Sequence, residues 1–148
     1  MRRIQVFFLS LVCLTSIAWK WQKDPHIEQY TRKGYQAWQA GHLTEALSFY
    51  ERASKLNPKD YDLLNTLGVI YEQVNLPHKA EEKYLSAIKL NEYFLPAYSN
   101  LGSLYWNQDD TKKASYYFQK RIQLGDPKDP WTIKAQKSLV TINKNNKW

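Results

Sequence analysis

Apolar residues recur every three or four positions in the middle of the chain, as in Leu63, Leu64, Leu67, Ile70, Tyr71 and Val74. This spacing places them on one face of an α-helix. Asn75-Leu76-Pro77 interrupts the run, and a second helical run extends from Ala80 to Ile88. The pattern therefore predicts a pair of helices, over 62–74 and 78–90, joined by a short turn.

The same two-helix pattern occurs before and after the middle pair. It predicts helices over 28–40, 44–56, 96–107 and 111–124. Thr44 and Asp110 are expected to be N-caps, because their side-chain oxygens can accept from free N–H groups of the first turn. Asn57-Pro58 is expected to end the helix that precedes it.

Three classes of residue repeat with a period of 34. The glycines are Gly34, Gly68 and Gly102, the alanines are Ala46, Ala80 and Ala114, and the aromatics are Tyr50, Tyr84 and Phe118. Such self-similarity is typical of stacked helical hairpins. Small residues let two helices approach closely, and the larger side chains fill the space between layers.

Two of the three units carry a longer shared pattern. It reads Leu64-x2-Leu67-Gly68-x2-Tyr71, Ala80-x3-Tyr84 and Ala87 in one, and Tyr98-x2-Leu101-Gly102-x2-Tyr105 and Ala114-x3-Phe118 in the next. This pattern resembles the tetratricopeptide repeat, over residues 27–127. The first unit differs at Lys33 and Ala37, which replace leucine and tyrosine, and Arg121 replaces an alanine in the third.

The predicted fold is all-α: a right-handed solenoid of three helical hairpins with a C-terminal capping helix. The predicted divisions are a signal peptide or membrane anchor over 1–18, a linker over 19–26, repeat units over 27–60, 61–94 and 95–128, a capping helix over 129–143 and a tail over 144–148. Asp129-Pro130-Trp131 opens the capping helix, since proline is favoured in the first helical turn. This helix is expected to cover the last apolar face of the stack.

The first eighteen residues are predicted to be a targeting segment. Arg2 and Arg3 precede a mainly apolar run, and Ser16 and Ala18 are small residues at alternate positions near its end. This pattern favours a signal cleaved after Ala18, and hence export to a periplasm, a cell envelope or the medium. The alternatives are an uncleaved membrane anchor with Trp19 and Trp21 at the interface, although the run is shorter than the ~20 apolar residues of a usual span, and a buried core helix.

Composition restricts the chemistry. The 148 residues suit one domain, and a single cysteine excludes an intramolecular disulfide and a cysteine-cluster zinc site. His26, His42 and His78 form no metal-binding pair and are expected to be solvated, while Asp109-Asp110 is expected to cap a helix. Since no titratable residues converge, we expect no enzyme activity, no cofactor and no metal.

In the tetratricopeptide repeat family the first helix of each hairpin lines a concave face, so the resemblance implies a partner-binding groove there. The residues that the repeat pattern leaves unconstrained on these helices are Glu28, Thr31, Tyr35, Trp38, Asp62, Asn65, Val69, Glu72, Ser99, Ser103 and Trp106. Trp38 and Trp106 occupy equivalent positions, and large amphipathic rings are frequent interface anchors. The alternative is that both rings pack against neighbouring hairpins as core.

Some family members hold a partner's C-terminal carboxylate with lysine, asparagine or arginine side chains from three repeats. The corresponding positions here are Thr31, Tyr35, Thr66, Pro96 and Asn100, which do not reproduce that set. A mixed aromatic, acidic and small polar groove instead suits a helix or an extended peptide with apolar anchors.

The sequence thus predicts a non-enzymatic scaffold or adaptor that binds a peptide or helix of another protein. The net charge of +7 offers an alternative, a module that binds nucleic acid or anionic lipid. Its lysines are scattered over outer helices, so no nucleic-acid partner is expected. The N-terminal segment could bring the chain to a membrane, and the oligomeric state is not predicted.

Overall fold

The computed structural model describes residues 24–145, which form seven α-helices and no strand. The helices are α2 (Pro25–Gln39), α3 (Leu43–Leu56), α4 (Tyr61–Gln73), α5 (Pro77–Leu90), α6 (Leu95–Asn107), α7 (Thr111–Leu124) and α8 (Pro130–Asn145). The predicted all-α class is confirmed. The largest boundary difference is at the start of α2, where the Asp24 carboxylate accepts from the His26 N–H at 2.9 Å and begins the helix inside the predicted linker.

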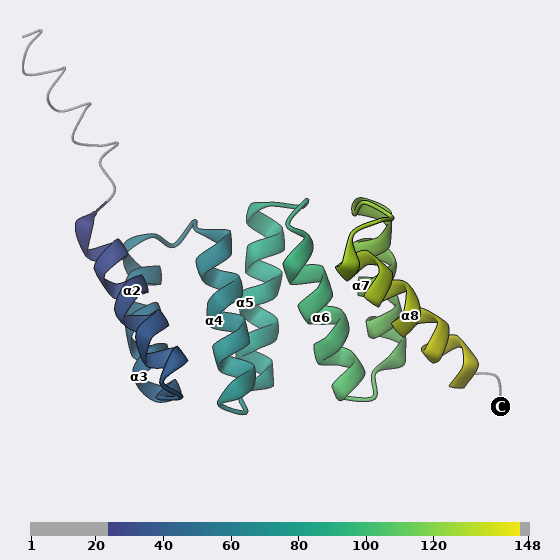
Figure 1. Cartoon of the computed structure of the whole chain (residues 1–148), viewed down its shortest axis with the longest axis horizontal. Helices are drawn as coiled ribbons and strands as arrows, with labels where there is room; N and C mark the ends of the chain where they lie inside the picture. Colours follow the sequence, from purple (N-terminus) through teal and green to yellow (C-terminus); the bar gives the residue numbers. More distant parts are fainter. Residues whose placement is uncertain (1–23, 146–148) are drawn as a thin grey trace, which may run out of the picture.

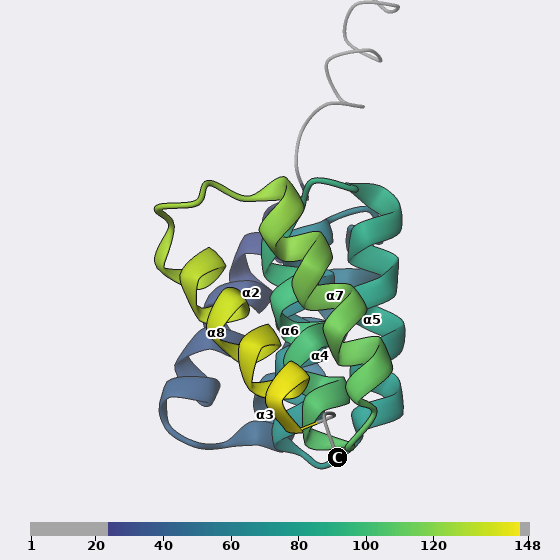
Figure 2. The same cartoon turned by 90° about the vertical axis from the view of Figure 1, so that its right-hand side faces the viewer.

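Consecutive helices form three hairpins, α2–α3, α4–α5 and α6–α7, which follow one another along the long axis (Figure 1). Each second helix also packs on the next first helix, so that α3 contacts α4, α5 contacts α6, and α7 contacts α8. The first helices meet as well, since α6 contacts both α4 and α8. Seen along the stack, α8 lies toward the same side as α2, and α5 lies on the opposite side (Figure 2). The capping helix therefore extends the layer of first helices.

The 34-residue period corresponds to a contact inside each hairpin. A Cβ on Gly102 would lie 2.6 Å from the Phe118 ring, and a Cβ on Gly34 would lie 2.8 Å from the Tyr50 ring. The aromatic ring of each second helix thus rests directly on the backbone of the first helix. Only glycine leaves room for that approach, and the packing role predicted for both residue classes is confirmed.

The turn inside each hairpin has a period of 34 too. One residue in each turn has a left-handed backbone, with φ of 78°, 59° and 59° at Gly41, Asn75 and Asp109. Glycine, asparagine and aspartate are the residues that adopt this conformation most readily. The spacing of apolar residues did not predict this left-handed residue in each turn.

This turn explains one wrong prediction and one correct one. Thr44 does not cap α3, because the helix already begins at Leu43 and His42 occupies the N-cap position without a side-chain hydrogen bond. Asp110 does cap α7, since its carboxylate accepts from the Lys113 N–H at 3.0 Å. Asn57 follows α3 as its C-cap, as predicted.

The predictions at the two ends of the chain have different outcomes. The targeting segment over 1–18 lies outside the described residues, as do most of the linker and the last part of the tail. At the C-terminal end, α8 continues to Asn145, two residues past the predicted end at 143. Among the described helices, none combines the length and apolarity needed to cross a membrane.

Candidate protein-binding site

The first helices form a layer joined by side-chain hydrogen bonds. Between α6 and α4, the side-chain amide N–H of Asn100 donates to the side-chain oxygen of Asn65 at 2.9 Å. Between α2 and α4, the Trp38 indole N–H donates to the Gln73 side-chain oxygen at 2.7 Å. Both bonds join residues 35 apart, which is one repeat plus one position. Residues predicted for the site on α2, α4 and α6 thus lie on one layer, referred to below as the first-helix face.

None of the predicted site residues is buried. Glu28, Tyr35 and Asp62 are exposed, and the remainder are partly exposed. Their backbones are distributed along α2, α4 and α6, from the first turn to the last. The first-helix face therefore keeps these side chains accessible, as a binding surface requires.

The two tryptophans were predicted either to line the binding groove or to pack as core, and each ring has features of both. Trp38 and Trp106 are half-buried and pack against the hydrophobic core. The indole N–H of Trp38 is already engaged by Gln73, so this ring offers a partner its exposed edge and not its donor. Trp38 thereby joins the first hairpin to the second.

Glu72 is bound within its own hairpin. The Tyr84 hydroxyl donates to the Glu72 carboxylate at 2.5 Å. Desolvation raises the pKa of Glu72 above its usual value, and the hydrogen bond from Tyr84 opposes that rise. Asp62 is the accessible acid of the same helix, and desolvation together with the nearby Asp60 carboxylate raises its pKa. Of the two predicted carboxylates on this helix, Asp62 is thus the more accessible one.

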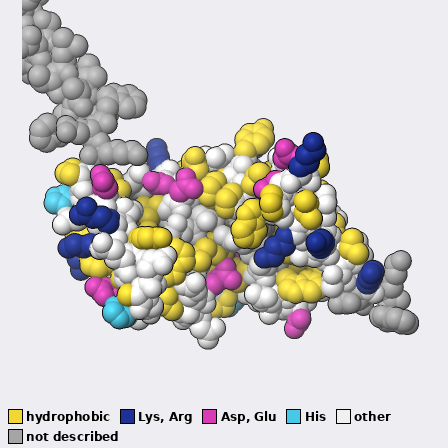
Figure 3. Space-filling model, viewed as in Figure 1, with side chains coloured by type: hydrophobic (Ala, Val, Ile, Leu, Met, Phe, Trp, Pro, Cys, Tyr) yellow, Lys and Arg dark blue, Asp and Glu magenta, His cyan; other side chains and the backbone are white. Residues whose placement is uncertain are grey.

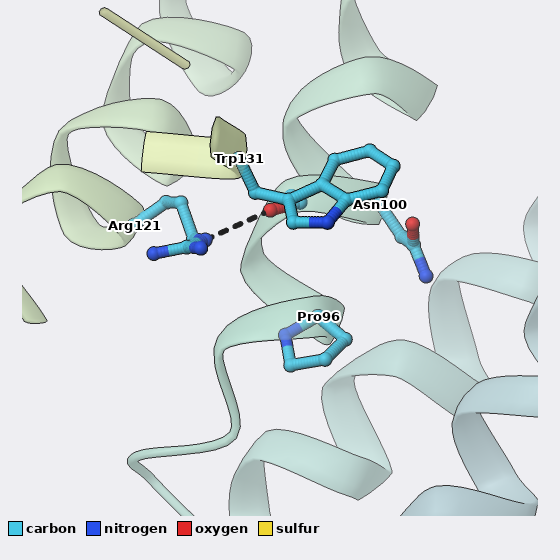
Figure 4. A pocket seen from close by; sticks show the side chains of 5 residues that line it. Pro96, Asn100, Arg121 and Trp131 are labelled. Carbon is cyan, nitrogen blue, oxygen red and sulfur yellow. Dashed lines mark hydrogen bonds between the residues drawn. The ribbon is translucent and has the colours of Figure 1, made fainter. Parts of the chain in front are cut away.

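A pocket of about 240 Å³ opens between α6 and α8 (Figure 4). It is lined by Pro96, Ser99, Asn100, Arg121 and Trp131. A smaller pocket of about 80 Å³ adjoins it, shares Ser99, Asn100 and Trp131, and includes Lys134. Two adjoining pockets thus lie at the C-terminal end of the first-helix face.

Arg121 forms the floor of this pocket. Its side chain is buried, and its Nε donates to the Ser99 hydroxyl at 3.1 Å. One terminal nitrogen donates to the Thr132 hydroxyl at 2.7 Å, and the other pairs with the Asp129 carboxylate. Partial desolvation disfavours the charged form of Asp129, but hydrogen bonds from the Thr132 N–H and from Arg121 hold its pKa below the usual value. The arginine that departs from the repeat pattern therefore fastens the start of α8 to α6 and α7.

Sequence reasoning missed the residues that α8 adds to the site. Trp131 is 59% exposed although it is a large aromatic, and the Lys134 ammonium lies 5.2 Å from its ring centre. One signal was present: Pro96 and Pro130 are 34 residues apart, so the repeat pattern continues into α8. The capping helix is also a fourth first helix.

Lysine and arginine do not form a continuous track on the face shown in Figure 3. They gather toward the two ends of the stack, and the middle carries mainly hydrophobic and uncharged side chains with several acidic ones. Some lysines of the outer helices lie over tyrosine rings, with Lys79 5.5 Å from the centre of Tyr71 and Lys113 4.6 Å from the centre of Tyr105. These cations contribute to packing within the fold.

The described residues contain no cluster of three or more histidine, cysteine, aspartate or glutamate side chains that could hold a metal. His26, His42 and His78 are all exposed, as predicted. The side chains of the first-helix face offer hydrogen bonding, apolar contact and charge pairing. That set suits recognition of a polypeptide.

Known proteins resemble the chain in sequence and in fold. A family model for the tetratricopeptide repeat matches residues 28–60 and 95–124. Mouse BBSome complex member BBS4 is 35% identical over 78 residues, which are 53% of this chain and 15% of that protein. The chain therefore matches only a small part of the length of this relative.

Two solved structures share the fold over most of the chain. The first is the first tetratricopeptide domain of Spaghetti (RPAP3) bound to the HSP90 peptide SRMEEVD, with a TM-score of 0.72 and 20% identity over 80% of this chain and 91% of that one. The second is PcrH in complex with the chaperone binding region of PopD, with a TM-score of 0.73 and 16% identity over 80% of this chain and 91% of that one.

Proposed function

Since the chain is a tetratricopeptide repeat protein, we propose that it is a non-enzymatic scaffold that binds a segment of another protein on its first-helix face. The observation that carries this proposal is the accessible layer of α2, α4, α6 and α8, which ends in a pocket of about 240 Å³. The RPAP3 domain holds a peptide and PcrH holds a region of PopD, which supports a polypeptide ligand for this fold.

The ligand is proposed to be an internal segment and not a chain terminus. The Thr31 hydroxyl donates to the Ile27 carbonyl oxygen at 3.0 Å, and the Thr66 hydroxyl donates to the Asp62 carbonyl oxygen at 2.9 Å. Both hydroxyls are thus occupied within their own helices, at positions where carboxylate-binding relatives need free donors. An internal helix or extended peptide makes no demand for a carboxylate site.

A nucleic-acid or anionic-lipid function is the weaker candidate. Binding to phosphates depends on several cations that face one ligand. The cations in Figure 3 lie toward opposite ends of the stack, which argues against such a surface on that face.

We propose in addition that residues 1–18 direct the chain out of the cytoplasm, as a cleaved signal or as an anchor that keeps the scaffold at a membrane. Mass spectrometry of the protein from its source cells tests this. A chain that begins at Trp19 supports cleavage, and an intact Met1 in the membrane fraction supports an anchor. An intact chain in the soluble cytoplasmic fraction would refute both.

Affinity capture with matched variants tests the binding face. Ser103→Arg places a long charged side chain on the partly exposed middle of α6, whereas Tyr116→Ala removes an exposed ring from the outer helix α7. We expect Ser103→Arg to abolish capture of partners that the wild type retains, and Tyr116→Ala to leave capture unchanged. Equal capture by all three proteins, each with the circular dichroism spectrum of the wild type, would contradict the assignment of this face.

A further inference from the structure

The pocket between α6 and α8 has room for one large side chain. Its volume of about 240 Å³ exceeds the ~150 Å³ of a protein cavity that holds benzene, and is smaller than the ~300–1,000 Å³ of sites for drug-sized ligands. Pro96 and the indole of Trp131 form apolar walls (Figure 4). These dimensions suit a single leucine-sized or aromatic side chain.

The floor of the pocket offers no unpaired positive charge to an anionic group. The positive charge of Arg121 is balanced by Asp129, and each of its three nitrogens already donates to an oxygen of the chain. A carboxylate placed on this floor would lose its hydration without finding an unpaired cation. An apolar side chain has no such cost.

The rim of the pocket on α8 is positively charged. Helix α8 contains no acidic residue, and its cations are Lys134, Lys137 and Lys144. Lys134 lines the adjoining small pocket, and no ion pair engages it within residues 24–145. Helix α6, on the other side, has no charged residue. A cation without an ion pair in the described part of the chain, whose ammonium lies 5.2 Å from the centre of the Trp131 ring, therefore lies next to the apolar pocket.

We propose that this pocket binds an apolar–acidic segment of a partner protein: a leucine-sized or aromatic side chain enters between Pro96 and Trp131, and an aspartate or glutamate close to it in sequence pairs with Lys134. The inference rests on the proposed function and names the chemistry of the ligand. Charge complementarity with α8 selects an acidic segment over a neutral or basic one.

A random peptide library displayed on phage and selected against the full chain in mild detergent tests the proposal. We expect the retained peptides to share one bulky apolar residue with aspartate or glutamate within three positions. The best peptide, measured by fluorescence anisotropy, should bind Trp131→Ala at least about tenfold more weakly, because an aromatic at the centre of a site carries much of the affinity. Trp131→Phe, which keeps an apolar wall, should restore most of the binding.

Reversal of charge tests the second half of the proposal. On Lys134→Glu, the same peptide with lysine in place of its acidic residue should bind more tightly than the original. Tyr116→Ala, on the outer helix, should bind both peptides as the wild type does. Selected peptides without an acidic residue, or with equal affinity for Lys134→Glu, would refute the charge pairing.

Two further outcomes would overturn the proposal and separate it from the proposed function. Peptides that lose binding on Tyr35→Ala or Asp62→Lys, but bind Trp131→Ala normally, would show that the first-helix face binds segments elsewhere than in this pocket. Failure to select any peptide, together with capture unaffected by Ser103→Arg, would refute the proposed function and the pocket together.

Discussion

The two ends of the solenoid are closed by different means. At the C-terminal end, α8 covers α7 and is held by the buried Arg121. At the N-terminal end, no described helix precedes α2, and two cations lie over aromatic rings instead: Lys33 is 5.7 Å from the ring centre of Phe49, and Arg52 is 5.9 Å from that of Tyr30.

The departures from the repeat pattern account for this difference. Tyr71 donates a hydrogen bond at 2.6 Å to Glu51 of the preceding hairpin, whereas no described hairpin precedes the first unit, which carries Ala37 at that position. Repeat arrays need polar terminal faces to stay soluble. The departures from the repeat pattern, Lys33 and Ala37 in the first unit and Arg121 in the third, thus occur in the two outermost hairpins that the structure describes.

Replacement of one arginine at each end should give the largest contrast. Arg121→Ala removes a buried cation and its bonds to Asp129 and Thr132, so we expect a loss of about 3 kcal/mol in the free energy of unfolding. Arg52→Ala removes a cation–π contact and should cost under ~1 kcal/mol. Urea denaturation measures both, and hydrogen exchange should show that Arg121→Ala exposes the amides of α8 first.

Arg121→Met separates charge from packing in this experiment. Methionine fills much of the same volume but cannot pair with Asp129, so its stability should fall between those of the wild type and Arg121→Ala. If Arg121→Ala were as stable as Arg52→Ala, the alanine of the repeat pattern would be sufficient there and α8 would not depend on the arginine.

Matched glycine substitutions should give a smaller contrast. An alanine Cβ at Gly102 would lie 2.6 Å from Phe118, in a helix held by α4, α5, α7 and α8. At Gly34 it would lie 2.8 Å from Tyr50, but α2 packs mainly on α3, is joined to α4 through the Trp38–Gln73 hydrogen bond, and has fewer neighbouring helices than α6, so it can shift. Overpacking costs ~1–3 kcal/mol, and alanine gains ~1 kcal/mol of helix propensity. We expect Gly102→Ala to lower the stability by about 1–2 kcal/mol.

Gly34→Ala should stay within ~1 kcal/mol of the wild type, because movement of α2 relieves the contact. Urea midpoints of the two variants compare the ends directly. Equal losses would mean that α2 is held as firmly as α6.

Much of the fold could be predicted because the period of 34 records contacts within single hairpins. Gly34, Gly68 and Gly102 pack against rings in the same hairpin, so sequence spacing and spatial contact coincide. The start of α3 was wrongly predicted at Thr44, because the turn contains a left-handed residue, Gly41, and α3 begins at Leu43. The spacing of hydrophobic residues carries no information about backbone dihedral angles in a turn.

The site was less predictable because the pocket between α6 and α8 depends on contacts between units. Trp131 follows Pro130 in a segment interpreted only as a cap, and its place beside α6 depends on the link from Arg121 to Asp129. Glu72 was assigned to a partner, yet Tyr84 occupies it within the hairpin. Spacing indicates which side chains share a face, but not which of them are already bonded.

Restoration of the repeat pattern at the N-terminal end should change association more than stability. Lys33→Leu combined with Ala37→Tyr replaces an exposed cation and a buried alanine, which line one pocket between α2 and α3, with the leucine and tyrosine found in the other units, and so makes this end more apolar. We expect concentration-dependent self-association in sedimentation velocity, beyond that of the wild type. An unchanged sedimentation coefficient would show that Lys33 and Ala37 do not limit stacking at this end.

The smallest predicted effect is a pH dependence confined to the C-terminal end. Hydrogen bonds hold the pKa of Asp129 below its usual value of about 3.9, against an opposing desolvation effect, so the carboxylate stabilises the fold above pH ~3.9. This contribution is lost as the pH falls through the lowered pKa. The amide signal of Thr132, whose N–H donates to Asp129 at 3.0 Å, should therefore titrate with a midpoint below pH ~3.9 in an NMR series. Asp129→Asn should abolish that titration, whereas Asp110→Asn, which removes the N-cap of α7, should leave it in place. A midpoint at or above the ordinary value would mean that the carboxylate is not held by Arg121 in solution, and that the C-terminal end is closed by apolar contacts alone.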